Sequence, residues 1–249
     1  MANHFPLRLI GSRMLAASVR HLDFARDDGL PLDFIPGQFI QVHFNYPDGL
    51  PTKRSYSLAT IHEHALEPGE AVEIAVSYVP GGAATALFTA LDEGQQIQAS
   101  GPYGRFCLGL NDSNRRYLLI GTGTGVTPYR AMLPQLAQMM AARNVEVVLL
   151  FGARTPAELI YGDDFAAFAA EHPRFRFVPC FSREMPADPH PDVRRGYVQD
   201  ALQEFAPDAA GDIAYLCGNP NMVDAAFEAL KAQGLPVPHI RREKYVSSK

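Results

Sequence analysis

The residues whose spacing most clearly suggests chemistry are three glycines at alternate positions: Gly121, Gly123 and Gly125. They follow an apolar run at 117–120, which is typical of a buried parallel strand. Pro128 then opens an amphipathic run that predicts a helix over 128–142. Glycines let backbone N–H groups approach a pyrophosphate, and the N-terminus of a helix favours negative charge. The stretch therefore predicts a cradle for an anion.

This loop matches neither of two common nucleotide-binding motifs in full. It lacks the Gly-Lys-Ser/Thr that ends the P-loop of an NTPase. The strict Gly-x-Gly-x-x-Gly pattern needs glycine where Val126 stands, and the next strand, 145–151, is followed by Arg154 rather than by a carboxylate for the ribose. We predict a nucleotide loop of a different sub-type, and a glycine-rich connector without a ligand is the alternative.

Composition narrows the function classes. The chain has 249 residues, of which 47% are hydrophobic and 20% charged, so it is long enough for two globular domains. A net charge of −5 argues against a nucleic-acid binder. Cys107, Cys180 and Cys217 are far apart and form no CxxC, which excludes a disulfide framework and a four-cysteine iron–sulfur cluster. We expect buried free thiols, no metal site, no membrane span and a cytoplasmic monomer.

The sequence pattern changes near residues 109–114, which divides the chain into two parts. Before that point, short runs between turn signals predict an antiparallel barrel with one helix at 84–91; the runs lie at 12–21, 39–44, 54–59, 71–79 and 96–100. After it, strands and helices alternate, which predicts a parallel sheet covered on both faces. The strands are expected at 117–120, 145–151, 175–179 and 213–217, the helices at 128–142, 163–171, 196–205 and 220–233, and a last apolar piece at 237–240.

Two spots in the first half could bind a flat, anionic cofactor. On a strand, Arg54 and Tyr56 would share one face and Ser55 and Ser57 the other, so that the guanidinium could meet a phosphate and the phenol ring a flat ligand. An ordinary amphipathic strand is the alternative. The run 81–85 places glycines and a hydroxyl at a helix start, which fits either a phosphate site or a plain N-cap.

Polar residues also follow the strands of the second half. Arg154 follows the second strand, Ser182 and Arg183 follow the third, and a Cys-Gly-Asn-Pro-Asn-Met run at 217–222 follows the fourth. Ligands of such sheets bind at the carboxyl ends of the strands, so these donors could converge on a phosphate. A solvated surface is the alternative for any single arginine.

Together these motifs resemble the ferredoxin–NADP⁺ reductase family over nearly the whole chain. Arg54-Ser55-Tyr56-Ser57 is similar to the family's RxYS flavin motif, and the runs 80–85 and 101–106 are similar to its flavin-phosphate loop and the following turn. The runs 121–128 and 217–222 are similar to its nicotinamide-nucleotide loop and its CGxPxM segment. The resemblance implies a six-stranded antiparallel Greek-key barrel that binds flavin, 1–110, and a five-stranded parallel nucleotide domain, 111–249.

The resemblance also implies roles for individual residues. Ser57, Cys217, Glu243 and Tyr245 would be catalytic, with Ser57 near flavin N5, Cys217 near nicotinamide C4 and Tyr245 over the second face of the ring. FAD would be bound by Arg54, Ser55, Tyr56, Ser57, Val76, Ser77, Tyr78, Gly82, Ala83, Ala84, Thr85, Thr124 and Tyr245. NADP(H) would be bound by Gly121, Thr122, Gly123, Thr124, Gly125, Arg154, Ser182, Arg183, Tyr197, Cys217, Gly218, Asn219 and Met222.

The activity that the resemblance implies is electron transfer between NADP(H) and a one-electron carrier, ferredoxin or flavodoxin, by hydride transfer between nicotinamide C4 and flavin N5. Basic residues could steer an acidic carrier: Lys53, Arg54, Arg241, Arg242 and Lys244. An NADH-linked reductase that serves free flavin or an oxygenase, and a flavin-free nucleotide-binding regulator, are the alternatives. The tail departs from the plant-type pattern because four residues follow Tyr245.

Overall fold

The computed structural model describes residues 4–246 and contains two compact units. The first comprises residues 4–108 and 127–134, and the second comprises residues 109–126 and 135–246. The chain therefore returns to the first unit for eight residues after it has entered the second. The division into a flavin domain at 1–110 and a nucleotide domain at 111–249 stays a prediction.

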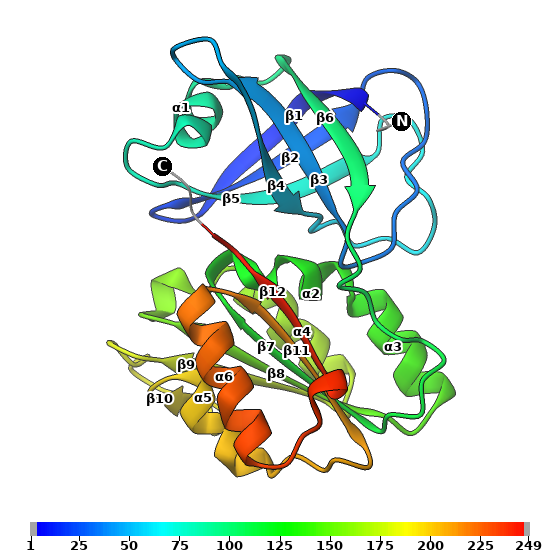
Figure 1. Cartoon of the computed structure of the whole chain (residues 1–249), viewed down its shortest axis with the longest axis vertical. Helices are drawn as coiled ribbons and strands as arrows, with labels where there is room; N and C mark the ends of the chain where they lie inside the picture. The colour runs from blue at the N-terminus through cyan, green and yellow to red at the C-terminus, as the bar shows by residue number, and fades with distance from the viewer. Residues whose placement is uncertain (1–3, 247–249) are drawn as a thin grey trace. The chain divides into compact units, whose positions relative to one another are not determined.

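The first unit is the six-stranded antiparallel barrel that the sequence predicted (Figure 1). Its strand order is β4-β3-β6-β1-β2-β5, so β6 lies between β1 and β3, which are its partners in the sheet. A bridge between Leu58, which directly follows β4, and Ile74 in the middle of β5 joins these two strands. The elements are β1 His4–Ala16, β2 Val19–Arg26, β3 Phe39–Asn45, β4 Pro51–Ser57, β5 Ala71–Ser77, α1 Ala83–Ala90 and β6 Gln96–Tyr103.

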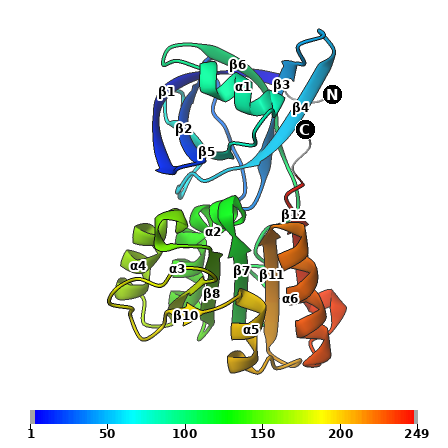
Figure 2. The ribbon, with the colours of Figure 1, turned by 90° about the vertical axis from the view of Figure 1, so that its left-hand side faces the viewer.

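The barrel encloses a core of alternating apolar residues. Leu7 and Leu9 of β1, Leu22 and Phe24 of β2 and Ile74 of β5 are fully buried, as period-two alternation requires. Helix α1 packs on this core through Phe88, and Figure 2 shows the helix lying across the strands at one end of the barrel. The Arg20 guanidinium donates to the Phe88 carbonyl at 2.6 Å, which satisfies a carbonyl in the last turn of α1.

One predicted strand of the barrel was wrong. The run at 12–21 is the end of β1, a turn at Ala17 and Ser18, and the start of β2, which pair antiparallel in register Met14↔Arg20. The turn contains no glycine, proline, asparagine or aspartate, and Ser18 favours a turn only weakly, so no strong signal marked it.

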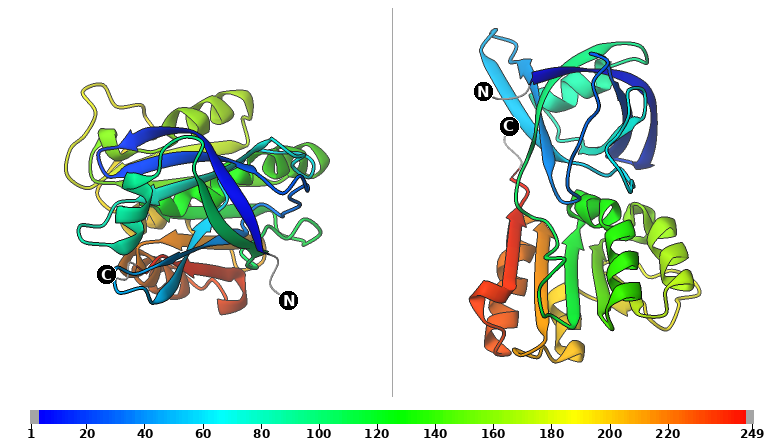
Figure 3. Two further views of the ribbon diagram at one scale, coloured as in Figure 1. Left: turned by 90° about the horizontal axis from the view of Figure 1, so that it is seen from above. Right: turned by 90° about the vertical axis from the view of Figure 1, so that its right-hand side faces the viewer.

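The second unit is a parallel sheet with strand order β10-β9-β8-β7-β11-β12. It has six strands rather than the predicted five, because the two-residue β10 adds to the edge beside β9. Figures 2 and 3 show α3 and α4 on one face and α5 and α6 on the other. The strands are β7 Arg116–Thr122, β8 Glu146–Ala153, β9 Phe175–Phe181, β10 Arg194–Arg195, β11 Asp212–Gly218 and β12 Ile240–Lys244. The helices are α2 Thr127–Ala131, α3 Leu133–Ala142, α4 Gly162–Glu171, α5 Val198–Ala201 and α6 Pro220–Ala232, with short 3-10 turns at Gly123–Val126, Pro156–Glu158, Leu202–Phe205 and Val237–His239. Of these helices, α2 lies in the first unit.

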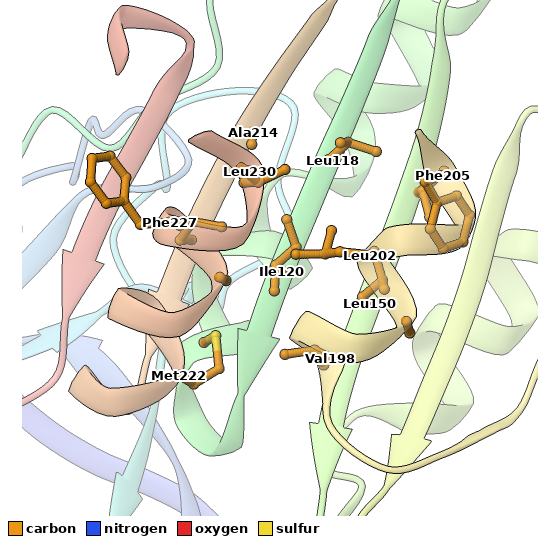
Figure 4. Close-up of a cluster of buried hydrophobic side chains, with 14 of the residues drawn as sticks. Leu118, Ile120, Leu150, Val198, Leu202, Phe205, Ala214, Met222, Phe227 and Leu230 are labelled. Carbon is orange, nitrogen blue, oxygen red and sulfur yellow. The ribbon is translucent and has the colours of Figure 1, made fainter. Parts of the chain in front are cut away.

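Buried aliphatic side chains fix α5 and α6 on their face of the sheet (Figure 4). Leu118 and Ile120 of β7 and Leu150 of β8 meet Leu202 and Leu230 from the helical layer. Strands covered on both faces are expected to be continuously apolar, and β11 is buried at every position.

Two elements of this half of the chain differ from the prediction. The helix at 128–142 is interrupted at Met132, because Pro134 has no N–H to donate and its ring would clash with the carbonyl four residues earlier. The last strand begins where the apolar piece 237–240 ends and runs through Arg241, Arg242 and Glu243. It is an edge strand, where charged side chains are common and protect the open edge.

The longest helix in residues 4–246 has 13 residues, and none of the described helices has the length and apolarity needed to cross a membrane.

Candidate functional site

Arg54 is held in the first unit by neutral acceptors. Its guanidinium donates to the Tyr46 hydroxyl at 2.9 Å, to Thr52 Oγ1 at 3.0 Å and to the Lys53 carbonyl at 2.9 Å. Within residues 4–246, no carboxylate lies within ion-pair distance of Arg54. The positive charge is thus pre-oriented and uncompensated, which suits binding of a pyrophosphate.

The rest of strand β4 offers a ring and a buried hydroxyl. Arg54 and Tyr56 lie on one face by register, opposite Val42 and Ile40. Tyr56 packs edge-on against Phe88 of α1, with ring centroids 5.3 Å apart, and burial raises its pKa well above the ordinary value. Ser55 is exposed, whereas Ser57 at the strand end is buried. The phenol therefore stays neutral and its ring is held in place by α1.

A second anion-binding element precedes α1. Val79 donates its N–H to Thr85 Oγ1 at 2.8 Å, and Gly82 donates to the Val79 carbonyl at 2.9 Å, which closes a tight loop. Gly82 caps the helix without a side chain, and the first turn, with Ala83 and Ala84, contains no acidic residue. Beside this loop, Val76 is buried, Ser77 is exposed and Tyr78 donates its N–H to the Ser18 carbonyl at 2.7 Å. This helix N-terminus is suited to a phosphate.

In the second unit, the glycine loop is packed so closely that it admits no side chain at Gly125. A Cβ there would lie 2.3 Å from the Cys217 carbonyl oxygen and 2.5 Å from Gly218 Cα. Gly218 has φ +125°, and its own Cβ would lie 2.6 Å from the Thr122 carbonyl oxygen. Gly123 has φ +54° and no atom within 4 Å of such a Cβ, so the loop is open at this position. The loop is therefore closed against β11 on one side and accessible to a ligand at Gly123.

The end of β11 brings together three residues predicted to be catalytic. Cys217 pairs in register with Glu243 of β12, and Tyr245 donates its N–H to the Gly218 carbonyl at 2.8 Å. Burial raises the pKa of the Cys217 thiol well above its usual value, the Glu243 carboxylate adds to the rise, and a side-chain hydrogen bond with Tyr245 opposes it. Cys217 is consequently a neutral thiol at physiological pH rather than a nucleophilic thiolate.

The segment that follows Cys217 starts helix α6. Asn219 accepts a hydrogen bond from the Asn221 N–H at 2.9 Å and donates its own N–H to Thr122 Oγ1 at 3.2 Å. Met222 is buried in the core beneath α6. The Asn219 cap thus ties the start of α6 to the strand that carries the glycine loop.

The two arginines predicted to read a 2′-phosphate differ in their partners. Arg154 forms a two-point ion pair with Glu158, with Nε–Oε2 at 2.7 Å and a second contact at 2.5 Å, and this pairing raises the Arg154 pKa. Arg183 is exposed, has no carboxylate within ion-pair distance in the described chain, and donates its N–H to the Arg154 carbonyl at 2.9 Å. Ser182 likewise donates to the Ala153 carbonyl, and Tyr197 is 61% exposed. Arg183 is the more available cation.

Two of the basic residues predicted to steer a carrier are engaged on α6. Arg242 lies over the Phe227 ring at 3.8 Å from its centroid, and Lys244 pairs with Asp224 at 2.7 Å. Arg241 is exposed. A steering role for this strand stays a prediction, with the charge of Lys244 offset by its partner. Residues 247–249 of the tail lie outside the described residues.

Sequence reasoning missed a buried polar cluster in the barrel. His21 Nε2 lies 2.6 Å from Asp23 Oδ1 and 3.8 Å from Glu73 Oε2, and Arg130 of α2 pairs with the same Glu73 oxygen. Possible ligand atoms of His21, Asp23 and Glu73 lie within 4.8 Å of one another. Because the Arg130 guanidinium already binds Glu73, we interpret the cluster as an ion-pair network rather than a metal site. His21 and Asp23 lie two residues apart, but Glu73 and Arg130 come from distant parts of the chain, so no motif could reveal the cluster.

The network gives a pH-dependent stability. Burial lowers the His21 pKa below 6.5 and Arg13 lowers it further, against the opposing effect of Asp23 and Glu73. In the unfolded chain His21 binds a proton as the pH falls through about 6.5, whereas in the folded chain it stays neutral until the pH reaches its lowered pKa. The free energy of unfolding therefore decreases as the pH drops from 6.5 toward that lowered pKa. We expect His21→Gln to flatten this acid-side slope in urea unfolding measured from pH 7.5 to pH 5. Equal slopes in the two proteins would remove His21 as the cause.

The two units together offer the groups that two cofactors need. Arg54 and the start of α1 fit a flavin with its phosphates, and the glycine loop, open at Gly123 and packed on the neutral Cys217 at Gly125, fits a pyridine nucleotide. An antiparallel barrel followed by a doubly covered parallel sheet with a glycine loop after its first strand defines the class of two-domain flavin reductases.

Comparisons with known proteins give the family. A sequence model of the oxidoreductase FAD-binding domain matches residues 6–107, and one of the oxidoreductase NAD-binding domain matches residues 119–228. Ferredoxin–NADP reductase B of Sorangium cellulosum is 35% identical over 251 residues, which cover 98% of each chain. The reductase subunit of an aromatic O-demethylase from Amycolatopsis is 37% identical over 253 residues, which cover 96% of this chain and 70% of that one. The crystal structure of an Amycolatopsis cytochrome P450 reductase matches with a TM-score of 0.84 at 33% identity, over 99% of this chain and 71% of that one.

The chain belongs to the ferredoxin reductase-type family of oxidoreductases, which confirms the resemblance. It is a flavoprotein oxidoreductase with an FAD-binding and an NAD-binding domain. The roles of individual residues stay predictions.

Proposed function

We propose that this protein is an NADPH-dependent reductase that passes electrons to a separate one-electron carrier, ferredoxin or flavodoxin. The observation that carries the proposal is the cluster at the end of β11, where the neutral Cys217 packs against the glycine loop at Gly125 and the Tyr245 N–H donates to the Gly218 carbonyl. The full-length similarity to a ferredoxin–NADP reductase supports it.

In this proposal FAD, when bound, supplies the exchange between a two-electron hydride donor and a one-electron acceptor. Arg54 and the N–H groups at the start of α1 hold its anionic phosphates, and Tyr56 presents a neutral ring fixed by Phe88. The glycine loop binds the pyrophosphate of the pyridine nucleotide, with Thr122 and Thr124 beside it. Cys217 keeps its proton and offers a neutral contact, and Glu243 is the candidate to hold a proton nearby.

A second candidate function is that of an NADH-linked reductase component of an oxygenase. The ion pair between Arg154 and Glu158 favours it, because a paired arginine attracts a 2′-phosphate less strongly. The similarity to the reductase subunit of an aromatic O-demethylase points the same way.

The experiment that tests the proposed function is a visible spectrum of the purified protein before and after anaerobic addition of NADPH. We expect flavin absorbance near 450 nm that bleaches with NADPH, followed by reduction of an added ferredoxin or flavodoxin. A protein that stays colourless after incubation with FAD, or whose flavin is not bleached by either pyridine nucleotide, would overturn the proposal.

Nucleotide preference separates the two candidates. We expect Arg183→Ala to lower the ratio of kcat/KM for NADPH over NADH by about ten-fold or more, because a charged hydrogen bond to phosphate contributes about 1.5–3 kcal/mol. The NADH rate should hardly change. Glu158→Gln should raise the same ratio by about two- to five-fold, since it releases Arg154 from an exposed pair. An unchanged ratio in Arg183→Ala would remove this residue from the site.

A further inference from the structure

Arg130 belongs to the short helix α2, which begins one residue after the glycine loop ends. The loop residues 121–126 are part of the second unit, whereas residues 127–134 are part of the first. The chain thus leaves the loop directly into a helix that is packed into the barrel unit. Within that unit, Tyr129 packs against Phe106, with ring centroids 6.1 Å apart.

The Arg130 side chain attaches this helix to the place where the barrel closes. Its NH1 group donates to the Ala59 carbonyl at 2.6 Å and also binds Glu73. Ala59 and Glu73 are themselves joined, because the Ala59 N–H donates to the Glu73 carbonyl at 2.8 Å next to the bridge between Leu58 and Ile74. One guanidinium therefore links α2 to the residues that directly follow β4 and to the middle of β5.

The contacts between Arg130 and Glu73 are largely buried, and other residues bind Glu73 as well. Only 11% of the Arg130 side chain and 19% of the Glu73 side chain are exposed. The Glu73 N–H donates to Thr60 Oγ1 at 2.7 Å, and His21 Nε2 lies 3.8 Å from the Glu73 oxygen that Arg130 binds and 2.6 Å from Asp23 Oδ1. A buried ion pair with several further hydrogen bonds holds one geometry rather than many.

We infer that Arg130 is a positioning residue, which fixes α2, the helix that directly follows the glycine loop, against Ala59 and Glu73 of the barrel. The inference rests on the proposed function, because its consequence is for hydride transfer. Ala59 follows the predicted flavin contact Ser57 by two residues, and Arg130 follows the predicted contact Thr124 by six. A single side chain thus joins the helix that follows the predicted nucleotide loop to the residues that follow a predicted flavin contact. Catalytic geometry is sensitive to such support, because a misplacement of about 1 Å costs about 100-fold in rate.

The test compares Arg130→Gln with Arg26→Gln in the flavin-loaded protein. Arg26 is a matched control, since it is a buried arginine of the same barrel that donates to Asp28 and to the Pro31 carbonyl, away from α2. The first readout is amide hydrogen exchange in residues 121–131, which we expect to rise by about ten-fold in Arg130→Gln alone. The second is rapid mixing with NADPH, in which the limiting rate of flavin bleaching per bound flavin should fall by about ten-fold or more while the nucleotide Kd changes less than about three-fold.

A purely structural role would lower the melting temperature of both variants and leave the limiting rate per bound flavin unchanged. Identical exchange and bleaching in Arg130→Gln and Arg26→Gln would therefore overturn the inference. If Arg130→Gln does not fold, the same two measurements are made on Glu73→Gln. Wild-type hydrogen exchange and a wild-type bleaching rate in Glu73→Gln would then overturn the inference. Failure of the proposed function is recognised separately, because the wild-type protein itself would then not bleach, whereas hydrogen exchange still reports on α2.

Discussion

Replacing Gly125 by alanine is expected to remove most of the reduction of the protein by pyridine nucleotide. The added Cβ would lie 2.3 Å from the Cys217 carbonyl oxygen and 2.5 Å from Gly218 Cα, and both are backbone atoms that cannot rotate away. The loop and β11 must separate, which displaces Cys217 from the predicted nucleotide-binding loop. We expect kcat/KM for NADPH to fall by about 100-fold or more, because reacting groups tolerate little misplacement. The overpacked unit should also lose about 1–3 kcal/mol of stability.

Gly123→Ala is the matched control for this prediction. Gly123 has φ +54°, so alanine in this left-handed conformation should lower the free energy of unfolding by about 1–2 kcal/mol. No atom lies within 4 Å of the added Cβ, so the substitution causes no clash. We expect a folded unit that binds NADP⁺ less tightly, since the methyl group projects into the open side of the loop. Urea unfolding and NADP⁺ titration measure the two effects. Equal nucleotide affinity in wild type and Gly125→Ala would contradict the geometry proposed for the loop.

The fold was largely predictable because its signals are local. The change from period-two alternation to alternating strands and helices separates the barrel from the parallel sheet, and the glycine loop follows the first strand of that sheet. The errors occur where a local signal was missing or was overridden. The turn at Ala17 and Ser18 carries none of the strong turn residues, and Pro134 interrupts what otherwise reads as one amphipathic helix.

The last strand shows a different limit of sequence reasoning. Arg241, Arg242, Glu243 and Lys244 look like a solvated tail by composition, yet they form β12 along the edge of the sheet, paired with β11. Pairing with a buried neighbour provides the hydrogen bonds, and an edge position leaves the charges in water. This strand carries Glu243 to the position opposite Cys217, so the location of a candidate catalytic group depended on tertiary pairing.

The positions of the glycines in the candidate site were predictable from the sequence, whereas the partners of its charged side chains were less so. Glu158 lies four residues after Arg154, a spacing at which the pair could have been anticipated, and it changes which arginine is available to a 2′-phosphate. The link from Arg130 to Glu73 spans 57 positions and joins a helix to a barrel strand, so only the folded chain reveals it. Specific partners of charged groups are therefore the part that the sequence leaves open.

The largest expected loss of stability comes from Asp212, at the opposite end of the sheet from the candidate site. Its carboxylate is buried, binds the Arg116 guanidinium at two nitrogens and accepts the Asp208 N–H at 2.8 Å. Asp212 and Arg116 are register partners, so this pair joins the first residues of β11 and β7. Asp212→Asn removes the charge and leaves a guanidinium that is only 22% exposed without its anion. We expect a loss of about 3 kcal/mol, the lower end for breaking a buried pair, and a fall in Tm of about 6–12 °C.

The neighbouring pair provides the control. Arg115 and Asp208 lie 2.9 Å apart but are 69% and 52% exposed, so Arg115→Ala should cost about 0–1 kcal/mol. Because the carboxyl ends of β7 and β11 carry the glycine loop and Cys217, Asp212→Asn should leave kcat/KM nearly unchanged well below its melting temperature. Thermal unfolding and steady-state kinetics on the same samples check both statements. If Asp212→Asn melted like Arg115→Ala, the buried pair would not be a main support of this sheet; if it lost kcat/KM while still folded, the two ends of the strands would be coupled more tightly than their register implies.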